Sequence, residues 1–203
     1  MAFETNVFIN CPFDANYLSL LRPLLFCVLD LEFEPRIALE RFDSGEPRFE
    51  KIVELIRDSK YAIHDLSRLR AREAGEVFRM NMPFELGLDV GCRRFKGGKW
   101  SNKKCLILEA ERYQYQAAIS DLSNSDIGVH SNEPAHVVVQ VRNWLSNQSQ
   151  IEFPGPERIW GRFTEFMAAN YDNLKARGFA DHDIDELPVD ELLRGMKRWL
   201  RNN

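Results

Sequence analysis

Short runs of β-forming residues alternate along the chain with longer stretches in which apolar residues recur every three or four positions. The first pattern is typical of strands, and the second is typical of helices with one apolar face. Pro23 falls inside one such helical stretch, where it should sit near the first turns or produce a kink. We expect strands at residues 5–10, 33–39, 61–65, 104–109 and 126–130, and helices at residues 17–31, 49–57, 81–92 and 135–145.

Strands that alternate with helices at this spacing predict βαβ units, and therefore a parallel sheet with helices on both faces. The near-continuous apolar run at residues 104–109 is typical of a strand buried on both faces, and Pro35 favours an edge position for the strand at 33–39. We therefore expect a flavodoxin-like, doubly wound α/β fold with about five parallel strands. Ligands of such sheets bind beyond the carboxyl ends of the strands, where the strand order reverses.

The chain changes character after residue 150, where two prolines and a glycine at residues 151–156 interrupt the pattern. Residues 159–171 then carry large aromatic and apolar side chains at helical spacing, and residues 189–200 carry a second apolar stripe. We divide the chain into an α/β domain at residues 1–150 and a C-terminal helical extension at residues 151–203. Apolar stripes this wide need cover, which is either the sheet domain or a self-association or partner surface.

Composition and charge narrow the functional classes. Hydrophobic residues make up 44% of the 203 residues and charged residues 29%, which excludes disordered, collagen-like and low-complexity chains. The net charge of −4 makes a nucleic-acid partner unexpected without a local basic face. The N-terminal residues lack a basic region followed by an apolar one, and no stretch approaches about 18 apolar residues, so we expect a soluble cytoplasmic protein with no membrane partner.

The cysteines give no sign of a metal or redox site. They are widely spaced, without a Cys-x-x-Cys pair or a histidine at ligand spacing. We expect reduced, small, buried side chains and no bound metal. The four positions are Cys11, Cys27, Cys92 and Cys105.

Polar and aromatic residues gather in the loops expected at the ligand-binding edge of the sheet. Asn81 is a candidate cap for the helix after the third strand and Pro83 suits its first turn, so Glu85 lies about one turn from the helix start. Glu85 points toward the cleft if Phe84 and Leu88 take the core side, although a glutamate there commonly just complements the helix dipole. Glu85 is the candidate catalytic residue, and the candidate substrate-binding residues are Asn10, Cys11, Pro12, Phe13, Asp14, Asp43, Ser44, Asp65, Ser67, Arg68, Arg79 and Asn81.

Basic residues are concentrated around this region. Residues 66–104 contain ten lysines and arginines against four carboxylates, a local charge of about +6 in a protein of −4. This asymmetry favours a nearby phosphate, which Arg68 and Arg79 are placed to grip unless they belong to an ordinary solvated face. Phe13 or Tyr17 is a candidate for stacking on a base, although an aromatic residue just past a strand is more often part of the core. The usual phosphate-cradling motifs GxGxxG and GxxxxGKS/T are absent.

Three short motifs resemble a known superfamily. They are Val7-Phe8-Ile9-Asn10, Ile63-His64-Asp65-Leu66-Ser67 and Phe84-Glu85-Leu86-Gly87. Their order and placement over residues 5–145 are similar to the Rossmann-like superfamily that joins nucleoside 2-deoxyribosyltransferases to TIR and TIR-like domains. The resemblance implies that Glu85 is the catalytic carboxylate and that Asp65 helps to hold the nucleoside.

The chain departs from both branches of this superfamily. Met82-Pro83 stands where deoxyribosyltransferases usually have a Gly-Thr pair, and the Trp-Cys type of approach found in TIR domains is missing. In its length and in its opening FINCPFD, the chain most resembles TIR-like proteins of bacterial antiphage defence that act on NAD. Such proteins typically become active on assembly, so the resemblance implies a homo-oligomer or an activating defence partner.

One carboxylate suffices for the chemistry that this resemblance implies. Cleavage of the ribose–nicotinamide bond of NAD⁺ expels a pyridine that leaves neutral, so Glu85 alone can stabilise the oxocarbenium-like transition state or capture the anomeric carbon. Asp14 and Asp43 would orient ribose hydroxyls. A neutral purine leaving group would instead need a proton donor, and the nearest candidates for this role are Asp65 and His64. Because adjacent residues of a strand alternate between its two faces, we expect His64 to point away from Asp65.

We therefore expect an NAD glycohydrolase or cyclase that uses NAD as its substrate and needs no other cofactor. Two alternatives stay open. One is a non-catalytic nucleotide-binding sensor or adaptor that uses the C-terminal helices for assembly. The other is a nucleoside deoxyribosyltransferase or nucleotide N-glycosidase.

Overall fold

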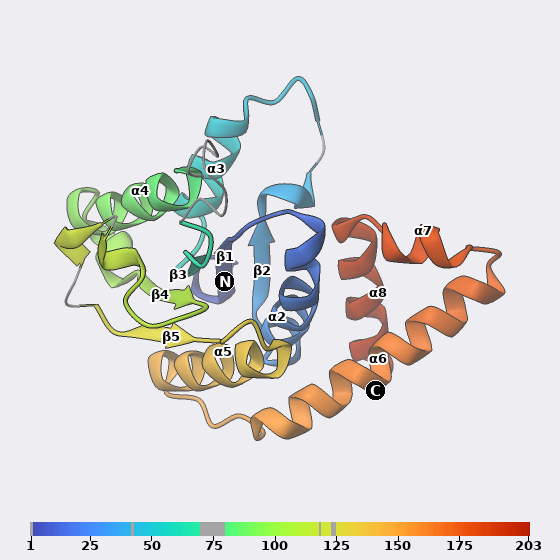
Figure 1. Ribbon diagram of the computed structural model, residues 1–203. Coiled ribbons are helices and arrows are strands. Elements are labelled where there is room, and N and C mark those ends of the chain that lie inside the picture. Colours follow the sequence, from blue (N-terminus) through green and yellow to red (C-terminus); the bar gives the residue numbers. More distant parts are fainter. Residues whose placement is uncertain (1, 42, 70–79, 118, 123–124) are drawn as a thin grey trace.

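A five-stranded parallel sheet forms the centre of the molecule (Figure 1). The computed structural model describes residues 2–41, 43–69, 80–117, 119–122 and 125–203. All neighbouring strands are parallel, and their order is that of the expected flavodoxin-like α/β fold. The strands are β1 (Asn6–Asn10), β2 (Glu34–Ile37), β3 (Tyr61–Asp65), β4 (Lys104–Glu109) and β5 (Ile127–Val129), in the spatial order β2-β1-β3-β4-β5.

The strand order reverses at β1. The chain runs from β1 to the edge strand β2 and then crosses back to β3, so that Val7 is in register with Pro35 on one side and Tyr61 on the other. Pro35 therefore lies on an edge strand, as predicted, where its missing N–H costs no ladder hydrogen bond. Every residue of β1 and β3 is buried. Their carboxyl ends, at Asn10 and Asp65, meet at the switch point where such folds bind ligands.

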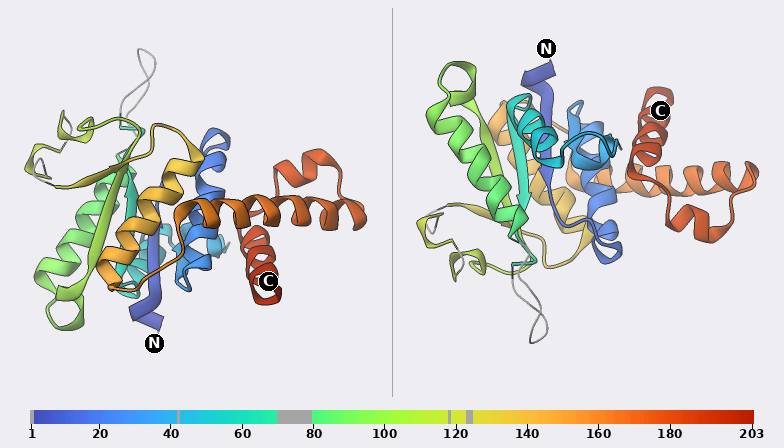
Figure 2. Two further views of the ribbon diagram at one scale, coloured as in Figure 1. Left: turned by 90° about the horizontal axis from the view of Figure 1, so that it is seen from below. Right: turned by 90° about the horizontal axis from the view of Figure 1, so that it is seen from above.

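Helices cover both faces of the sheet. Helices α2 (Leu18–Asp30) and α5 (Pro134–Ser149) pack together on one face, and α3 (Arg48–Arg57) and α4 (Asn81–Phe95) pack together on the other (Figure 1, Figure 2). Because α3 and α4 each follow a parallel strand, their N-terminal ends lie at the carboxyl edge of the sheet.

The crossover from β4 to β5 is different. Its described residues contain no α-helix, only the short 3-10 helices η4 (Tyr115–Ala117) and η5 (Ser120–Leu122). Strand β5 is also short: residues 107–109 of β4 pair with it, whereas residues 104–106 pair with β3 alone. Residues 104–106 of β4 therefore have no strand partner on their other side among the described residues.

The C-terminal helices continue the main core. Helices α6 (Pro156–Ala176) and α8 (Val189–Asn202) bring aromatic rings to α2, where the Phe26 ring lies 5.6 Å from that of Phe166 and 5.9 Å from that of Trp199. Most of their buried apolar residues belong to the same cluster as those of α2 and α5 and as Val7 and Ile9 of β1. The apolar stripes thus find their cover within the chain, on the α2 side of the sheet, while the far part of α6 and the short helix α7 (Asp181–Asp185) extend away from it (Figure 2).

Several short elements had no counterpart in the sequence pattern, because three to five residues are too few to show a period. They are α1 (Ala2–Thr5), α7 and the 3-10 helices η1 (Ala15–Tyr17), η2 (Ala38–Glu40) and η3 (Gly98–Asn102). Within the described residues, no helix combines the length and the apolar character needed to span a membrane.

Candidate active site between the first turns of α3 and α4

A cavity of about 250 Å³ opens at the carboxyl edge of the sheet, between the N-terminal halves of two helices. Helix α3 contributes one basic and two apolar side chains, and α4 contributes an amide, an aromatic ring and a carboxylate. The cavity is therefore an apolar cleft with a few polar groups, as is usual for small-molecule sites. Its lining residues are Arg48, Phe49, Ile52, Asn81, Phe84 and Glu85.

Glu85 lies on the sheet-facing side of α4. Met82, Glu85, Leu86 and Asp89 are the buried residues of this helix, and their spacing of three and four positions defines a single stripe. Only 6% of the Glu85 surface is exposed. Within the described part of the chain, no side chain or backbone group pairs with its carboxylate. Burial raises the pKa of Glu85 to about 7, although the charge of Arg48 opposes this rise.

The first turn of α4 differs in two details from the sequence-based expectation. The helix begins at Asn81 itself, with Met80 in the capping position and no side-chain cap, so Asn81 lines the cavity with an exposed side chain. Phe84 does not take the core side: it is 56% exposed, and Met82 and Leu86 fill the core in its place. The expectation was wrong because Glu85, not Phe84, falls in the buried stripe.

Two aromatic rings line the cavity. Phe84 from α4 and Phe49 from α3 have ring centroids 6.1 Å apart, and Phe49 is 49% exposed. Large exposed rings beside a buried carboxylic acid offer an apolar surface to a flat ligand. Sequence reasoning placed Phe49 in the apolar stripe of its helix and missed both this role and that of Arg48. The available signal was the Arg-Phe pair at a helix start on the ligand-binding edge.

Asn10 ties β1 to the start of α4. Its Nδ2 donates to the carbonyl of Met82 over 2.9 Å and lies 3.0 Å from Nδ1 of His64. The residue is almost fully buried. Asn10 was predicted as a substrate ligand, but its amide hydrogens are used inside the protein, where they fix the helical turn that carries Glu85.

His64 belongs to a buried polar chain beneath α4. Its Nε2 lies 3.5 Å from Oδ2 of Asp89, and Oδ1 of Asp89 lies 2.9 Å from Nζ of Lys103. Burial raises the pKa of Asp89, but the hydrogen bonds and charges of His64 and Lys103 outweigh it and leave the pKa below its usual value. His64 does point away from Asp65, toward α4, and no part of it reaches solvent.

Asp65 is fully buried on the other side of β3. Its Oδ2 accepts a hydrogen bond of 2.6 Å from the hydroxyl of Tyr17 and lies 3.1 Å from Nε2 of His130, and its Oδ1 accepts one from the N–H of Ser67. Burial raises the pKa of Asp65, but these partners lower it to a value below the usual range. Both of its oxygens are therefore engaged, and Tyr17 is held by this bond in the core instead of being free to stack on a base.

The loop after β1 joins the loop after β3 next to the cavity. Asp14 forms an ion pair of 3.1 Å with Arg68. Cys11 lies between these groups: burial raises the pKa of its thiol, and the charges of Asp65, Glu85 and Asp14 raise it further. The structure thus brings Cys11, Asp14, Asp65, Arg68 and Glu85 into one region.

The remaining residues that were predicted to bind the substrate do not line the cavity or lie outside the described residues. Pro12 is buried, and Phe13 is partly buried and packs on the apolar core. Asp43 and Ser44 lie in an exposed turn, where Oδ1 of Asp43 accepts the N–H of Gly45, and neither lines the cavity. Arg79 lies outside the described residues.

The described residues hold no group of histidine, cysteine and carboxylate side chains that is suited to a metal ion. No protein-family model, curated protein or solved structure matches this chain. Function must therefore be inferred from the cavity itself, which is lined by two aromatic rings, an arginine and a buried carboxylic acid that has no hydrogen bond or ion pair with the described residues.

Proposed function

We propose that this protein cleaves the N-glycosidic bond between ribose and nicotinamide in NAD⁺, by hydrolysis or cyclisation, with Glu85 as the catalytic carboxylate. The observation that supports this most directly is the burial of Glu85 without a partner in the described chain, inside a cavity at the carboxyl edge of the sheet. A carboxylate that forms no hydrogen bond or ion pair with the described residues is available to a positive charge that develops in a ligand.

The chemistry needs little more than this group. When the C1′–N bond breaks, both bonding electrons go to the nicotinamide nitrogen, the ring leaves neutral, and positive charge develops on the ribose. Glu85 stabilises that charge or forms an ester with C1′. In hydrolysis, water then supplies the hydroxyl group at C1′ and loses a proton, and the second product is ADP-ribose.

The rest of the cavity fits this substrate. Phe49 and Phe84 present half-exposed rings to a flat pyridinium, and a cationic ring is attracted to aromatic faces. Arg48 lies at the cavity without a hydrogen bond or ion pair to the described residues, so its guanidinium is available to a phosphate. A volume of about 250 Å³ holds the reacting nucleoside end and leaves the remainder of the dinucleotide outside.

The same geometry weighs against nucleoside deoxyribosyl transfer. A neutral purine needs a proton donor at the leaving nitrogen. The two candidates for that task, Asp65 and His64, are fully buried and engaged with other protein groups. A cationic leaving group, which needs no acid, is therefore the better match.

The experiment is incubation of the full chain with NAD⁺ and, separately, with deoxynucleosides, followed by chromatography for free nicotinamide or free base. We expect nicotinamide release by the natural protein and none by Glu85→Gln, which keeps the size of the side chain but cannot become anionic. Glu50→Gln is the matched control, because Glu50 is exposed in the first turn of α3 and does not line the cavity. It should react at the natural rate.

Two outcomes would contradict the proposal. Equal nicotinamide release by Glu85→Gln and by the natural protein would remove Glu85 from the mechanism. If neither nicotinamide nor free base is released at high protein concentration while nucleotide binding is retained, the result would favour a nucleotide-binding sensor that uses the same cavity.

A further inference from the structure

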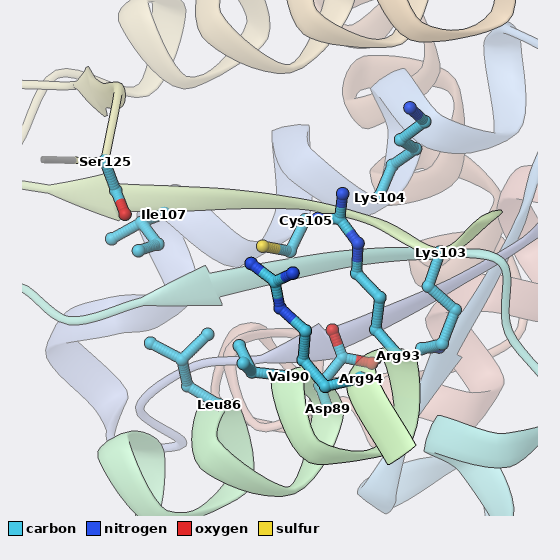
Figure 3. A pocket seen from close by; sticks show the side chains of 10 residues that line it. All are labelled: Leu86, Asp89, Val90, Arg93, Arg94, Lys103, Lys104, Cys105, Ile107 and Ser125. Atoms are coloured by element: carbon cyan, nitrogen blue, oxygen red, sulfur yellow. Dashed lines mark ion pairs between the residues drawn. The ribbon is translucent and has the colours of Figure 1, made fainter. Parts of the chain in front are cut away.

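A second cavity lies between the C-terminal half of α4 and strand β4 (Figure 3). Its volume is about 140 Å³, and its walls are α4, through Val90, Arg93 and Arg94, and β4, through Lys104 and Cys105. It shares no lining residue with the cavity that holds Glu85. The two are therefore separate sites that flank the buried stripe of one helix.

Besides Lys103, three basic residues line this second cavity. Arg93 and Arg94 rise from the last turn of α4 toward β4, where Lys104 begins the strand (Figure 3). Within the described part of the chain, none of the three side chains forms a hydrogen bond or an ion pair. Basic residues in a last helical turn commonly complement the helix dipole. Here the two arginines also point toward one cavity, whereas the Lys104 side chain points away from them (Figure 3), in a protein whose net charge is −4.

The carboxylate at the cavity is already neutralised. Asp89 is the acidic residue among the described lining residues, and its two oxygens lie 2.9 Å from Nζ of Lys103 and 3.5 Å from Nε2 of His64. Nζ of Lys103 also donates to the carbonyls of Ile56 and Ser59. The charges of Asp89 and Lys103 therefore balance one another, and Arg93 and Arg94 make the net charge at the cavity positive.

We propose that this cavity binds a small phosphate-bearing anion. Guanidinium groups donate paired hydrogen bonds to phosphate oxygens, and two of them on adjacent residues match a phosphate or diphosphate. The volume suits such a group better than a whole nucleotide, because sites for drug-sized ligands begin at about 300 Å³. The apolar side chains of Leu86, Val90 and Ile107 exclude water from one wall and strengthen these contacts.

The first test is isothermal titration of the full chain with inorganic phosphate, pyrophosphate and ADP. We expect binding by the natural protein and, for the double variant R93Q/R94Q, weakening by about tenfold or more, because charge-assisted hydrogen bonds are lost. The matched control is R158Q/R201Q, which removes the same charge from exposed positions on α6 and α8. Its affinity should stay within about twofold of the natural value, as for surface substitutions far from a site.

Cys105 provides a local readout. It lines the cavity and is partly buried, whereas Cys92 does not line it. Bound pyrophosphate should slow the alkylation of Cys105 by iodoacetamide, measured by mass spectrometry, and should leave Cys92 unchanged. In R93Q/R94Q this protection should disappear. Matching thermal unfolding curves would show that the double variant is folded.

The outcomes separate the ligand sources and can overturn the proposal. ADP binding as tightly as pyrophosphate indicates the diphosphate of a nucleotide, and tighter binding of pyrophosphate indicates a free phosphate compound. Equal weakening in both double variants, or no binding of any of the three probes at millimolar concentration, would overturn the site. Because Glu85 lines the other cavity, Glu85→Gln should bind pyrophosphate as the natural protein does, whatever its effect on NAD⁺.

Discussion

At the residue scale, the electrostatic surroundings of Glu85 dominate the candidate site. Burial between α3 and α4 disfavours the charged carboxylate and raises its pKa to about 7, and the Arg48 charge offsets only part of that effect. Glu85 is therefore present in both protonation states near neutral pH. Catalytic carboxylates are often tuned in this way.

The raised pKa predicts a pH profile for NAD⁺ cleavage. If the anion of Glu85 does the work, the rate should be low in mild acid, rise as the pH passes through about 7, and then level off. Initial rates of nicotinamide release across this range test it. A rate that falls as the pH rises through 7 would mean that Glu85 acts instead as a proton donor.

The same titration has a consequence for stability. Because the pKa of Glu85 is higher in the folded than in the unfolded chain, the folded state binds more protons between the two values, so stability falls as the pH rises through that interval. Glu85→Gln removes the buried charge and should unfold at a higher temperature than the natural protein at pH 8, by about 1–2 kcal/mol in stability. The difference should shrink in mild acid; a pH-independent difference would contradict the assigned pKa.

The exposed rings predict a specificity effect. Phe84→Ala should raise KM for NAD⁺ by about 2–10-fold, since an aromatic contact contributes about 0.5–1.5 kcal/mol. The matched control is Phe95→Ala at the far end of the same helix, where the ring is 89% exposed and lines no part of the cavity. Steady-state kinetics should separate the two variants; equal KM values would remove Phe84 from the site.

At the scale of elements, buried polar contacts with β1, β3 and the residue before β4 fix α4 to the sheet. Asn10 holds the Met82 carbonyl at its first turn, and the chain of His64, Asp89 and Lys103 holds it one turn after Glu85. Buried polar networks of this kind rigidify a site when every member is paired. They place Glu85 between two anchors on one helix.

This arrangement makes Asn10→Ala informative. The variant leaves the Met82 carbonyl without its donor and should lower stability by about 1–3 kcal/mol in chemical denaturation. Asn6→Ala is the control at the other end of β1, where Nδ2 donates to the carbonyl of Asp58 over 2.8 Å. Both should destabilise the protein, but only Asn10→Ala should also lower kcat. If both variants keep the kcat of the natural protein, the hydrogen bond from Asn10 to α4 has a purely structural role.

At the scale of the whole molecule, the C-terminal helices and the sheet share one core. Phe26 of α2 contacts Phe163 and Phe166 of α6 as well as Trp199 of α8. The division at residue 150 therefore marks a change in architecture from α/β to all-helical, while the apolar packing continues across it.

The shared core predicts one cooperative unfolding transition. Phe166→Ala, at a residue that is 1% exposed, should lower the stability of the entire chain by about 3–5 kcal/mol. Thermal unfolding followed by near- and far-UV circular dichroism should show coincident curves at a lower temperature. A separate early transition confined to the helices would indicate that they form an independent unit.

Local information in the sequence determined the elements. The period-two and period-3.6 patterns gave the limits of β3 and β4 correctly and those of most other elements to within a few residues, because each pattern reflects which side of one short segment faces the core. The parallel arrangement followed from the alternation of those elements. The position of Glu85 near the start of α4 also needed only the turn chemistry around residues 81–83.

Only the tertiary structure decided what surrounds that residue. Phe49 and Arg48 reach Glu85 from a helix more than thirty positions earlier in the chain, and Asn10, Tyr17 and Asp65 turned inward to partners on other elements. Local patterns carry no record of which distant groups meet, because hydrogen bonds, burial and pKa values depend on distances that exist only after the layers have packed. The sequence could therefore name the carboxylate, whereas the fold determined its protonation, its aromatic neighbours and the groups that hold it in place.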